Sequence, residues 1–314
     1  MSVGEMIAPR VAYGKALVEL VAANDRVVVL DGDVATSTQT AMVREARPDS
    51  FYEIGIAEQN MFGIAAGMST LGLIPYACTF AVFASKRACD QVSISIAYPA
   101  LNVKISGAYG GIPTGKAGAT HQAIEDIAIM RAMPNMTVVV PADATETAKA
   151  VFAAAEWEGP VYIRTARCPV PVIFDNDHAF EIGKAVLIRD GKDVTIVSTG
   201  MMTPKAKVAG ERLAQQGIDA RVVHVHTIKP LDQESVVAAA KETGAILTVE
   251  EHNILGGLGG AVAEVLMEAG VSCKFKRHGI NDEYSVIGKP FYLYRHYKLD
   301  AEGISSVARE FLNK

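Results

Sequence analysis

The stretch Gly55-Ile56-Ala57-Glu58-Gln59-Asn60, which precedes the apolar run of residues 61–68, decides how the rest of this chain is interpreted. Residues 61–68 are all small or apolar, and a helix of this composition is typical of a buried position. Glu58 would stand at the start of that helix, where a carboxylate is costly to bury without a partner. A carboxylate in such a position is a candidate functional group, so Glu58 is the first candidate for catalysis.

Two aromatic residues follow in the stretch Thr79-Phe80-Ala81-Val82-Phe83. Phe80 and Phe83 are three residues apart and would lie about one helical turn from each other. Aromatic residues at this spacing are more often part of a core than of a cofactor site. The spacing alone therefore assigns them no role.

The composition is typical of a soluble protein that binds neither nucleic acid nor membranes. The 314 residues include 30 basic and 35 acidic side chains, 50% of the residues are apolar, and no basic cluster of the kind that binds nucleic acid occurs. The apolar runs are shorter than the ~18 residues of a membrane span, and residues 1–10 lack the apolar core of a signal peptide. The four cysteines lie far apart, which argues against a zinc site and favours a reducing compartment. We expect a cytoplasmic protein.

Short apolar runs alternate with segments of helical periodicity along the whole chain. This alternation predicts an α/β fold with two open, mostly parallel, doubly wound sheets and helices on both faces. Between residues 168 and 193 the pattern loosens into prolines and Asp-rich turns, which indicates a linker. The predicted organisation is a first domain over residues 1–172, a linker over 173–190 with a short strand near 185–189, and a second domain over 191–314. Strands are expected at 27–30, 74–79, 102–106, 136–140, 161–164, 194–197, 220–223 and 245–249, and helices at 8–24, 39–46, 57–71, 83–97 and 204–216 and from 143, 232, 259 and 300 onward.

A glycine-rich loop at residues 110–118 follows a predicted strand and precedes a helix expected from Gln122 onward. Open α/β sheets bind ligands beyond the carboxyl ends of their strands, so this loop is a candidate binding site. His121 would lie near the N-terminus of the helix. It could be a solvated residue at a helix start or a proton donor or acceptor that faces the ligand, and the spacing favours neither.

Three further polar residues could line one crevice of the first sheet. Ser37 and Arg164 fall near the carboxyl ends of predicted strands, and Arg10 falls at a helix start. Arginine suits a phosphate because its planar fork donates two hydrogen bonds and keeps its charge. By contrast, Glu250-Glu251-His252 lie on one strand, where neighbouring side chains alternate between faces and cannot converge on a metal ion, so we interpret them as structural.

Together these stretches resemble the second half of a transketolase. The resemblance runs through nearly the whole chain, in order. It implies a pyrimidine-binding domain followed by the family's C-terminal domain, thiamine diphosphate as the cofactor, and transfer of a two-carbon ketol unit between phosphorylated sugars. Besides the stretches that contain Glu58 and Phe80, it rests on Gly118-Ala119-Thr120-His121-Gln122, Met133-Pro134-Asn135-Met136, Pro141-Ala142-Asp143, Ile228-Lys229-Pro230-Leu231-Asp232 and Thr248-Val249-Glu250-Glu251.

The resemblance also assigns roles to single residues. Glu58 would hydrogen-bond a ring nitrogen of the cofactor's aminopyrimidine and promote the tautomer that activates the cofactor. Phe80 and Phe83 would flank the pyrimidine ring, and aromatic packing of this kind contributes about 0.5–1.5 kcal/mol per pair beyond area burial. The implied site residues are Glu58 and His121 for catalysis; Glu58, Phe80, Phe83, Asp33 and His121 for the cofactor; and Arg10, Ser37 and Arg164 for the sugar phosphate.

The family's Gly-Asp-Gly…Asn motif, which holds the diphosphate through Mg²⁺, does not occur in this sequence, and Asp31-Gly32-Asp33 does not match it. The resemblance therefore implies a split transketolase. A second subunit would carry the diphosphate-binding domain and the Mg²⁺ ligands, and this chain, with no metal site of its own, would dimerise within an α2β2 assembly.

Three positions depart from the family pattern. Tyr109 replaces a phosphate-binding histidine, Ala117 replaces an acid that contacts a donor hydroxyl, and Lys86 replaces an aromatic residue near the pyrimidine. The donor and acceptor sugars therefore do not follow from the resemblance, and a non-standard phosphosugar is compatible with it.

Three other functions stay open at this point. The β subunit of a 2-oxoacid dehydrogenase has the same two domains, but the Ala-Thr-His-Gln run at 119–122 and the phosphate-binding set favour a transketolase. Deoxyxylulose-phosphate synthase shares the Glu-Gln and Thr-His features, but it is normally one long chain. A non-catalytic subunit that only binds a partner is the third alternative, and it predicts that replacing Glu58 leaves activity intact.

Overall fold

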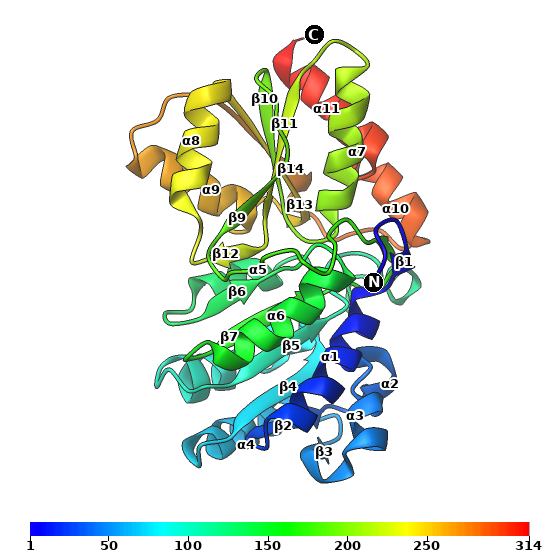
Figure 1. Cartoon of the computed structure of the whole chain (residues 1–314), viewed down its shortest axis with the longest axis vertical. Helices are drawn as coiled ribbons and strands as arrows, with labels where there is room; N and C mark the ends of the chain where they lie inside the picture. Colours follow the sequence, from blue (N-terminus) through cyan, green and yellow to red (C-terminus); the bar gives the residue numbers. More distant parts are fainter. Residues whose placement is uncertain (314) are drawn as a thin grey trace.

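The computed structural model of the chain describes residues 1–313. Two sheets follow one another along the long axis of the molecule, and each is covered by helices (Figure 1). The N-terminal half, blue to green, builds the lower sheet, and the C-terminal half, green to orange, builds the upper one. The predicted α/β fold with two mostly parallel, doubly wound sheets is confirmed.

The seven-stranded lower sheet is buried on both faces. Val27 and Val29 of the interior strand β2 pack in the apolar cluster that includes α1 and α6, whereas Val28 and Leu30 pack in the cluster that includes α4. This is why the strand reads as a continuous apolar run. The sheet order is β12-β6-β7-β5-β4-β2-β3, in which β12 (Thr227–Lys229) comes from the second half of the chain. The elements from the first half are β2 (Val27–Asp31), β3 (Phe51–Glu53), β4 (Ile74–Phe80), β5 (Lys104–Ala108), β6 (Thr137–Val139), β7 (Val161–Thr165), α1 (Pro9–Ala23), α2 (Ala35–Thr38), α3 (Ala41–Ala46), α4 (Glu58–Thr70), α5 (Asp126–Ala132) and α6 (Ala144–Glu156).

The five-stranded upper sheet has the same construction. All its neighbouring strands are parallel except β9, which runs antiparallel to β11. One face carries an apolar cluster with α7, α10 and α11, and the other packs against α8 and α9. The sheet order is β14-β13-β10-β11-β9, and the elements are β9 (Ala185–Arg189), β10 (Val194–Ser198), α7 (Met202–Ala214), β11 (Ala220–Val225), α8 (Gln233–Thr243), β13 (Ala245–Asn253), α9 (Leu258–Glu268), β14 (Lys274–Ile280), α10 (Pro290–His296) and α11 (Ala301–Leu312).

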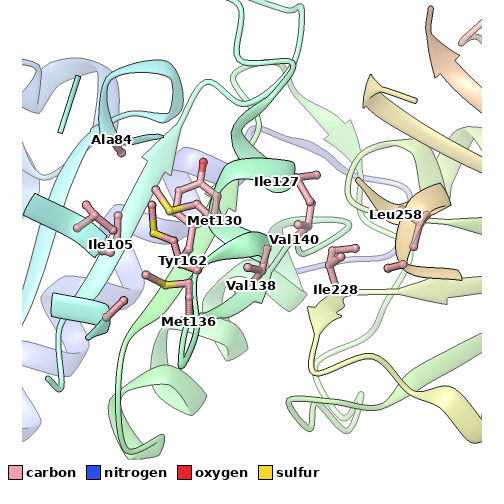
Figure 2. Packing of buried hydrophobic residues seen from close by; sticks show 14 of the residues in the cluster. Ala84, Ile105, Ile127, Met130, Met136, Val138, Val140, Tyr162, Ile228 and Leu258 are labelled. Atoms are coloured by element: carbon pink, nitrogen blue, oxygen red, sulfur yellow. The ribbon is translucent and has the colours of Figure 1, made fainter. Parts of the chain in front are cut away.

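The two halves share one apolar core and one strand. β12 (Thr227–Lys229), which follows the second sheet's β11 in sequence, pairs antiparallel with β6 at the edge of the first sheet. Figure 2 shows the apolar cluster running from Ile105 and Tyr162 of the first sheet through Val138 to Ile228 and Leu258 of the second half. A two-stranded ribbon of β1 (Met6–Ile7) and β8 (Val170–Pro171) closes the first half near the linker.

Several elements differ from the sequence-based expectation. The helix expected from Gln122 begins only at Asp126, because residues 118–125 form turns around an isolated bridge to Ala123. The helix expected at 39–46 is α3, which begins at Ala41, and the short helix α2 before it was not expected. The helix expected at 83–97 is two π-helical segments, η2 (Phe83–Arg87) and η3 (Gln91–Ala97). β3, β14 and α10 were not expected, because β3 and β14 are half polar edge strands and α10 is a single short helix.

Candidate active site

The site lies at the carboxyl edge of the first sheet. β2, β4 and β5 are parallel neighbours, so the residues that follow them meet at one edge. Asp33 follows β2, Phe80 ends β4, and Tyr109 follows β5. Asp33 and Tyr109 both have a positive backbone φ of 62°, which is uncommon for residues other than glycine. Such strain persists only where the surroundings impose it, and it concentrates at functional sites.

Four half-buried rings form a cluster at this edge. Phe80 and Phe83 have their ring centroids 5.8 Å apart, and Phe80 stacks on Tyr109 at 4.6 Å. His121 presents its edge to both phenylalanines, at 6.2 Å from Phe80 and 5.4 Å from Phe83. The structure therefore brings Phe80, Phe83 and His121 together in a cluster that is partly exposed to solvent, unlike the rings of an ordinary core.

His121 is not a helix-start residue, since it lies in a turn five residues before α5. Its Nδ1 is 2.9 Å from the Thr120 hydroxyl. The structure thus does not place His121 at a helix N-terminus, and its role toward a ligand stays a prediction.

Glu58 begins α4, as predicted, and its side chain is 1% exposed. Its charge has a partner that sequence reasoning missed. Nη1 of Arg87 donates to both carboxylate oxygens at 2.9 Å, and the same guanidinium covers the ring of Phe83 with its Cζ 4.0 Å from the ring centroid. The one signal in the sequence is a spacing, because Arg87 follows Phe83 by four residues.

Asp31 holds the short helix α2, which carries Ser37, and the residues around it. Its carboxylate accepts hydrogen bonds from the hydroxyls of Thr38 and Thr40 at 2.8 and 2.7 Å and from the backbone N–H of Val34 at 2.7 Å. Burial raises the pKa of Asp31 to about 6, although these hydrogen bonds oppose the rise. Sequence reasoning missed this residue, which has a structural role.

Arg10 lies against the same short helix. Its Nη1 donates to the carbonyl oxygen of Ser37 at 3.0 Å, and its Cζ lies 5.6 Å from the ring centroid of Tyr109. The buried Nε of Arg10 has no hydrogen-bond partner. Arg10 and Ser37 are thus placed together next to the aromatic cluster, and a donor of Arg10 remains available there.

Asp33 is exposed at the tip of the loop after β2. Its backbone N–H donates to Oε1 of Glu53 at 2.8 Å, and the N–H of Gly55 donates to the same oxygen at 3.3 Å. Glu53, which sequence reasoning did not single out, therefore ties the Asp33 loop to the turn before Glu58.

Arg164 is placed differently from its expected role. Its guanidinium is buried and pairs with Asp126, with Nε 2.7 Å from Oδ2, while Nη2 donates to the carbonyl oxygens of Ala123 and Glu251. Burial would lower the pKa of Arg164, but the Asp126 carboxylate raises it well above its usual range. A Cβ at Gly110 would lie 2.6 Å from Arg164 Nε, so the glycine makes room for the guanidinium. These contacts correct the expectation that Arg164 is free to grip a phosphate.

A second arginine stands where Arg164 was expected. Arg167 is exposed, its Nη1 donates to the carbonyl oxygen of Pro113 at 3.2 Å, and its Cζ lies 5.5 Å from the ring centroid of Tyr109. Tyr109 therefore lies near two cations, Arg10 and Arg167. The signal in the sequence was ambiguous, because Arg164 and Arg167 lie within three residues of each other at the end of the same strand.

The second half of the chain forms one wall of this region. Glu251 of β13 accepts from the backbone N–H of Ile112 at 3.1 Å and from the hydroxyl of Tyr294 at 2.6 Å. The loop before α10 packs on the glycine-rich loop, since a Cβ at Gly118 would meet Ile287 at 3.2 Å.

Lys86 pairs with Glu125 at 2.6 Å. Within residues 1–313 no group of three or more His, Cys, Asp or Glu side chains is arranged to hold a metal ion, and no helix could span a membrane.

The carboxyl edge of the first sheet thus carries a carboxylate at a helix start, a half-buried ring cluster and two cations, which are groups that suit a ligand with an aromatic ring and an anionic group. Comparison with known proteins agrees with this kind of site. Residues 5–171 match the pyrimidine binding domain of transketolase, and residues 183–304 match the transketolase C-terminal domain. The chain belongs to the transketolase family, whose members are transferases that use thiamine diphosphate with a divalent metal ion.

Proteins of similar length are among its relatives. The chain is 46% identical over 307 residues to a putative transketolase C-terminal section of Methanocaldococcus jannaschii, covering 97% of this chain and 96% of the relative. It is 41% identical over 310 residues to one of the subunits of the apulose-4-phosphate transketolase of Phocaeicola vulgatus, covering 98% and 99%. Among solved structures, a split-gene transketolase described as an inactive beta4 tetramer is 49% identical, with a TM-score of 0.91 and coverage of 98% and 99%. The resemblance inferred from the sequence is confirmed.

Proposed function

We propose that this chain is the pyrimidine-binding subunit of a split transketolase that transfers a two-carbon ketol unit between phosphorylated sugars. The observation that carries the proposal is the placement of Glu58, Phe80, Phe83 and His121 around one accessible edge of the first sheet. The relatives of matching length, named as a section or a subunit of a transketolase, support the same conclusion.

The residues of this edge fit the aminopyrimidine of thiamine diphosphate. Glu58 would hold a ring nitrogen, Phe80 and Phe83 would flank the ring, and Asp33 and His121 would lie beside it. The bound cofactor supplies the carbon nucleophile and the electron sink that ketol transfer needs. The protein's own part is to hold a proton between Glu58 and the ring nitrogen, to exclude water with the aromatic cluster, and to offer His121 Nε2 to a substrate oxygen.

The diphosphate and its Mg²⁺ would be held by a partner subunit. We expect an α2β2 assembly in which two copies of this chain contact each other and each completes a site with a partner. The four free cysteines suit a reducing compartment, so we place the complex in the cytoplasm.

The sugar phosphate would bind beside Tyr109. Arg10 and Arg167 approach this ring, Ser37 lies on the short helix α2 that Arg10 contacts, and Arg10 has a buried donor without a partner. Arg164, which pairs with Asp126, would support the floor of the site instead. Because Tyr109 and Ala117 differ from the usual histidine and acid, we expect a non-standard donor or acceptor phosphosugar.

Reconstitution tests the proposal. The purified chain is mixed with a diphosphate-binding partner subunit, thiamine diphosphate and Mg²⁺, and ketol transfer is measured on a panel of phosphosugars and their unphosphorylated forms. We expect activity only in the mixture, with a preference for phosphorylated sugars, and loss of at least about a hundredfold in kcat for Glu58→Gln. Full activity of Glu58→Gln would point to a non-catalytic subunit, and decarboxylation of a 2-oxoacid instead of ketol transfer would point to a dehydrogenase subunit.

A further inference from the structure

Arg87 contacts the two side chains that the cofactor needs, the Glu58 carboxylate and the Phe83 ring. Arg87 Nη1 donates to both oxygens of Glu58, so another ligand of this carboxylate would compete with the guanidinium. Its guanidinium also lies on the Phe83 ring at 4.0 Å, which is the contact distance of one flat group on another. An aminopyrimidine held by Glu58 and packed on Phe83 would meet Arg87 in both places.

The two partners are very unequal in exposure. The side chain of Glu58 is 1% exposed, whereas that of Arg87 is 45% exposed. Glu58 is fixed at the first turn of α4, but Arg87 ends the π-helical segment η2, and its long side chain reaches the carboxylate from the solvent side. Arg87 can therefore leave toward solvent without disturbing the core, while Glu58 cannot move.

We propose that Arg87 is a gate on the pyrimidine site: it neutralises Glu58 and covers Phe83 in the empty subunit, and it must be displaced when the cofactor binds. The gate rests on the proposed function, because it competes with the aminopyrimidine of thiamine diphosphate. While Arg87 is in place, its charge neutralises the Glu58 carboxylate. The apparent Kd of the cofactor is then the intrinsic Kd divided by the fraction of molecules in which Arg87 is withdrawn. If the gate is closed in about nine molecules of ten, the apparent Kd is raised about tenfold.

Binding measurements on the reconstituted complex test the gate. Isothermal titration calorimetry with thiamine diphosphate in the presence of Mg²⁺ compares the native complex with Arg87→Met, which keeps the length of the side chain and removes its charge and fork. We expect the Kd of Arg87→Met to fall by about three- to tenfold. The matched control is Arg221→Met, which removes an arginine from a surface pair with Asp190 and Glu242 and leaves the Kd unchanged.

Arg87→Met leaves the buried carboxylate unpaired, so its folding is tested separately. If it does not fold, Arg87→Lys keeps the charge but loses the planar contact with Phe83, and its Kd should still fall at least about twofold. A Kd that rises or stays constant in the folded variant overturns the gate and makes Arg87 a permanent partner of Glu58 in the loaded site. Absence of cofactor binding or ketol transfer in the native complex would instead overturn the proposed function.

Discussion

At the scale of single residues, Tyr109 joins the two parts of the proposed site. Its ring stacks on Phe80 and lies near Arg10 and Arg167. A neutral phenol is a weaker anion ligand than an imidazolium, so the two arginines supply the positive charge beside it. Because guanidinium groups keep their charge at every ordinary pH, the protein's side of phosphate binding should depend little on pH near neutrality.

Substitutions of Arg164 and Arg167 should have opposite effects on stability and on substrate binding. Arg164→Met leaves the fully buried Asp126 without its cation, and loss of one partner of a buried pair costs about 3–5 kcal/mol in the free energy of unfolding. Arg167→Met, at an exposed position, should stay within about 0.5 kcal/mol of the native protein and should raise the KM of phosphorylated sugars.

Urea denaturation of the chain and steady-state kinetics of the complex separate these effects. Unphosphorylated sugars serve as the control for Arg167→Met, since their KM should not change. A stable Arg164→Met protein with a raised KM would restore Arg164 to the phosphate site.

The sequence predicted the residues whose role follows from one position along the chain. Glu58 was predictable because a carboxylate at the start of an apolar helix is costly to bury without a partner or a function. Arg87 and Arg164 were not, because the direction of a long side chain depends on tertiary neighbours, here Phe83 and Asp126. Arg167 was not predicted because it lies only three residues after Arg164, and the sequence does not show that Arg164 is buried within the strand while Arg167, past its end, is exposed.

At the scale of elements, α9 depends on a buried acid rather than on a sequence-local cap. Both oxygens of Glu250, in the middle of β13, accept backbone N–H groups at the start of α9, from Leu258 at 2.7 Å and Gly259 at 2.8 Å. Burial raises the pKa of Glu250 to about 7, and these two hydrogen bonds oppose the rise. The interpretation of Glu250-Glu251-His252 as structural agrees with these contacts.

This arrangement leaves no room at Gly257. A Cβ there would lie 2.0 Å from Glu250 Oε2 and 2.8 Å from His252 Nδ1. Gly257→Ala should therefore lower the free energy of unfolding by about 1–3 kcal/mol, the range for inserting a methyl group into a packed site.

The matched control for that variant lies in the first turn of the same helix. A Cβ at Gly260 has its nearest atoms at 3.8 and 4.0 Å, so Gly260→Ala should be neutral or stabilising by up to about 1 kcal/mol. Equal effects of the two substitutions in urea denaturation would show that the α9 start is not tightly packed against Glu250.

At the scale of the whole molecule, a buried acid and three histidines join the two halves. Glu146 of α6 contacts His224 of β11 at 2.7 Å and His178 of the segment between the sheets at 3.2 Å, and the His226 ring lies 5.7 Å from that of His224. Burial would raise the pKa of Glu146, but neighbouring His224 and His178 hold it well below its usual range. Burial lowers the pKa of His226 to about 4.

The contribution of His226 to the stability of the chain should therefore fall on acidification. Between pH 6.5 and about 4 the unfolded chain binds a proton at His226 that the folded chain does not, so this group lowers the free energy of unfolding as the pH falls, whereas the raised pKa values of Asp31 and Glu250 act in the opposite direction. This one group contributes a slope of up to about 1.4 kcal/mol per pH unit. His226→Gln removes that contribution, so denaturation curves measured at several pH values should show the free energy of unfolding of the variant rising by this slope, relative to the native chain, as the pH falls. An unchanged slope would place a proton on His226 in the folded protein.

The order of the elements was readable from the chain because each strand and helix carries its own periodicity. The joining of the halves was not, since Thr227-Ile228-Lys229 is too short to signal a strand and pairs with β6, which lies far earlier in the chain. Long-range pairing of this kind leaves no local pattern in a sequence.

The position of β12 has a practical consequence for anyone who wishes to produce the pyrimidine-binding half alone. A polypeptide cut after the linker would lose Thr227–Lys229 and the hydrogen bond from the N–H of Val140 to the carbonyl oxygen of His226. β6 would then become an unprotected edge with valines and free backbone groups, which is a template for self-association. A recombinant half would have to carry a grafted β12 or a charged substitution on β6, or it would precipitate.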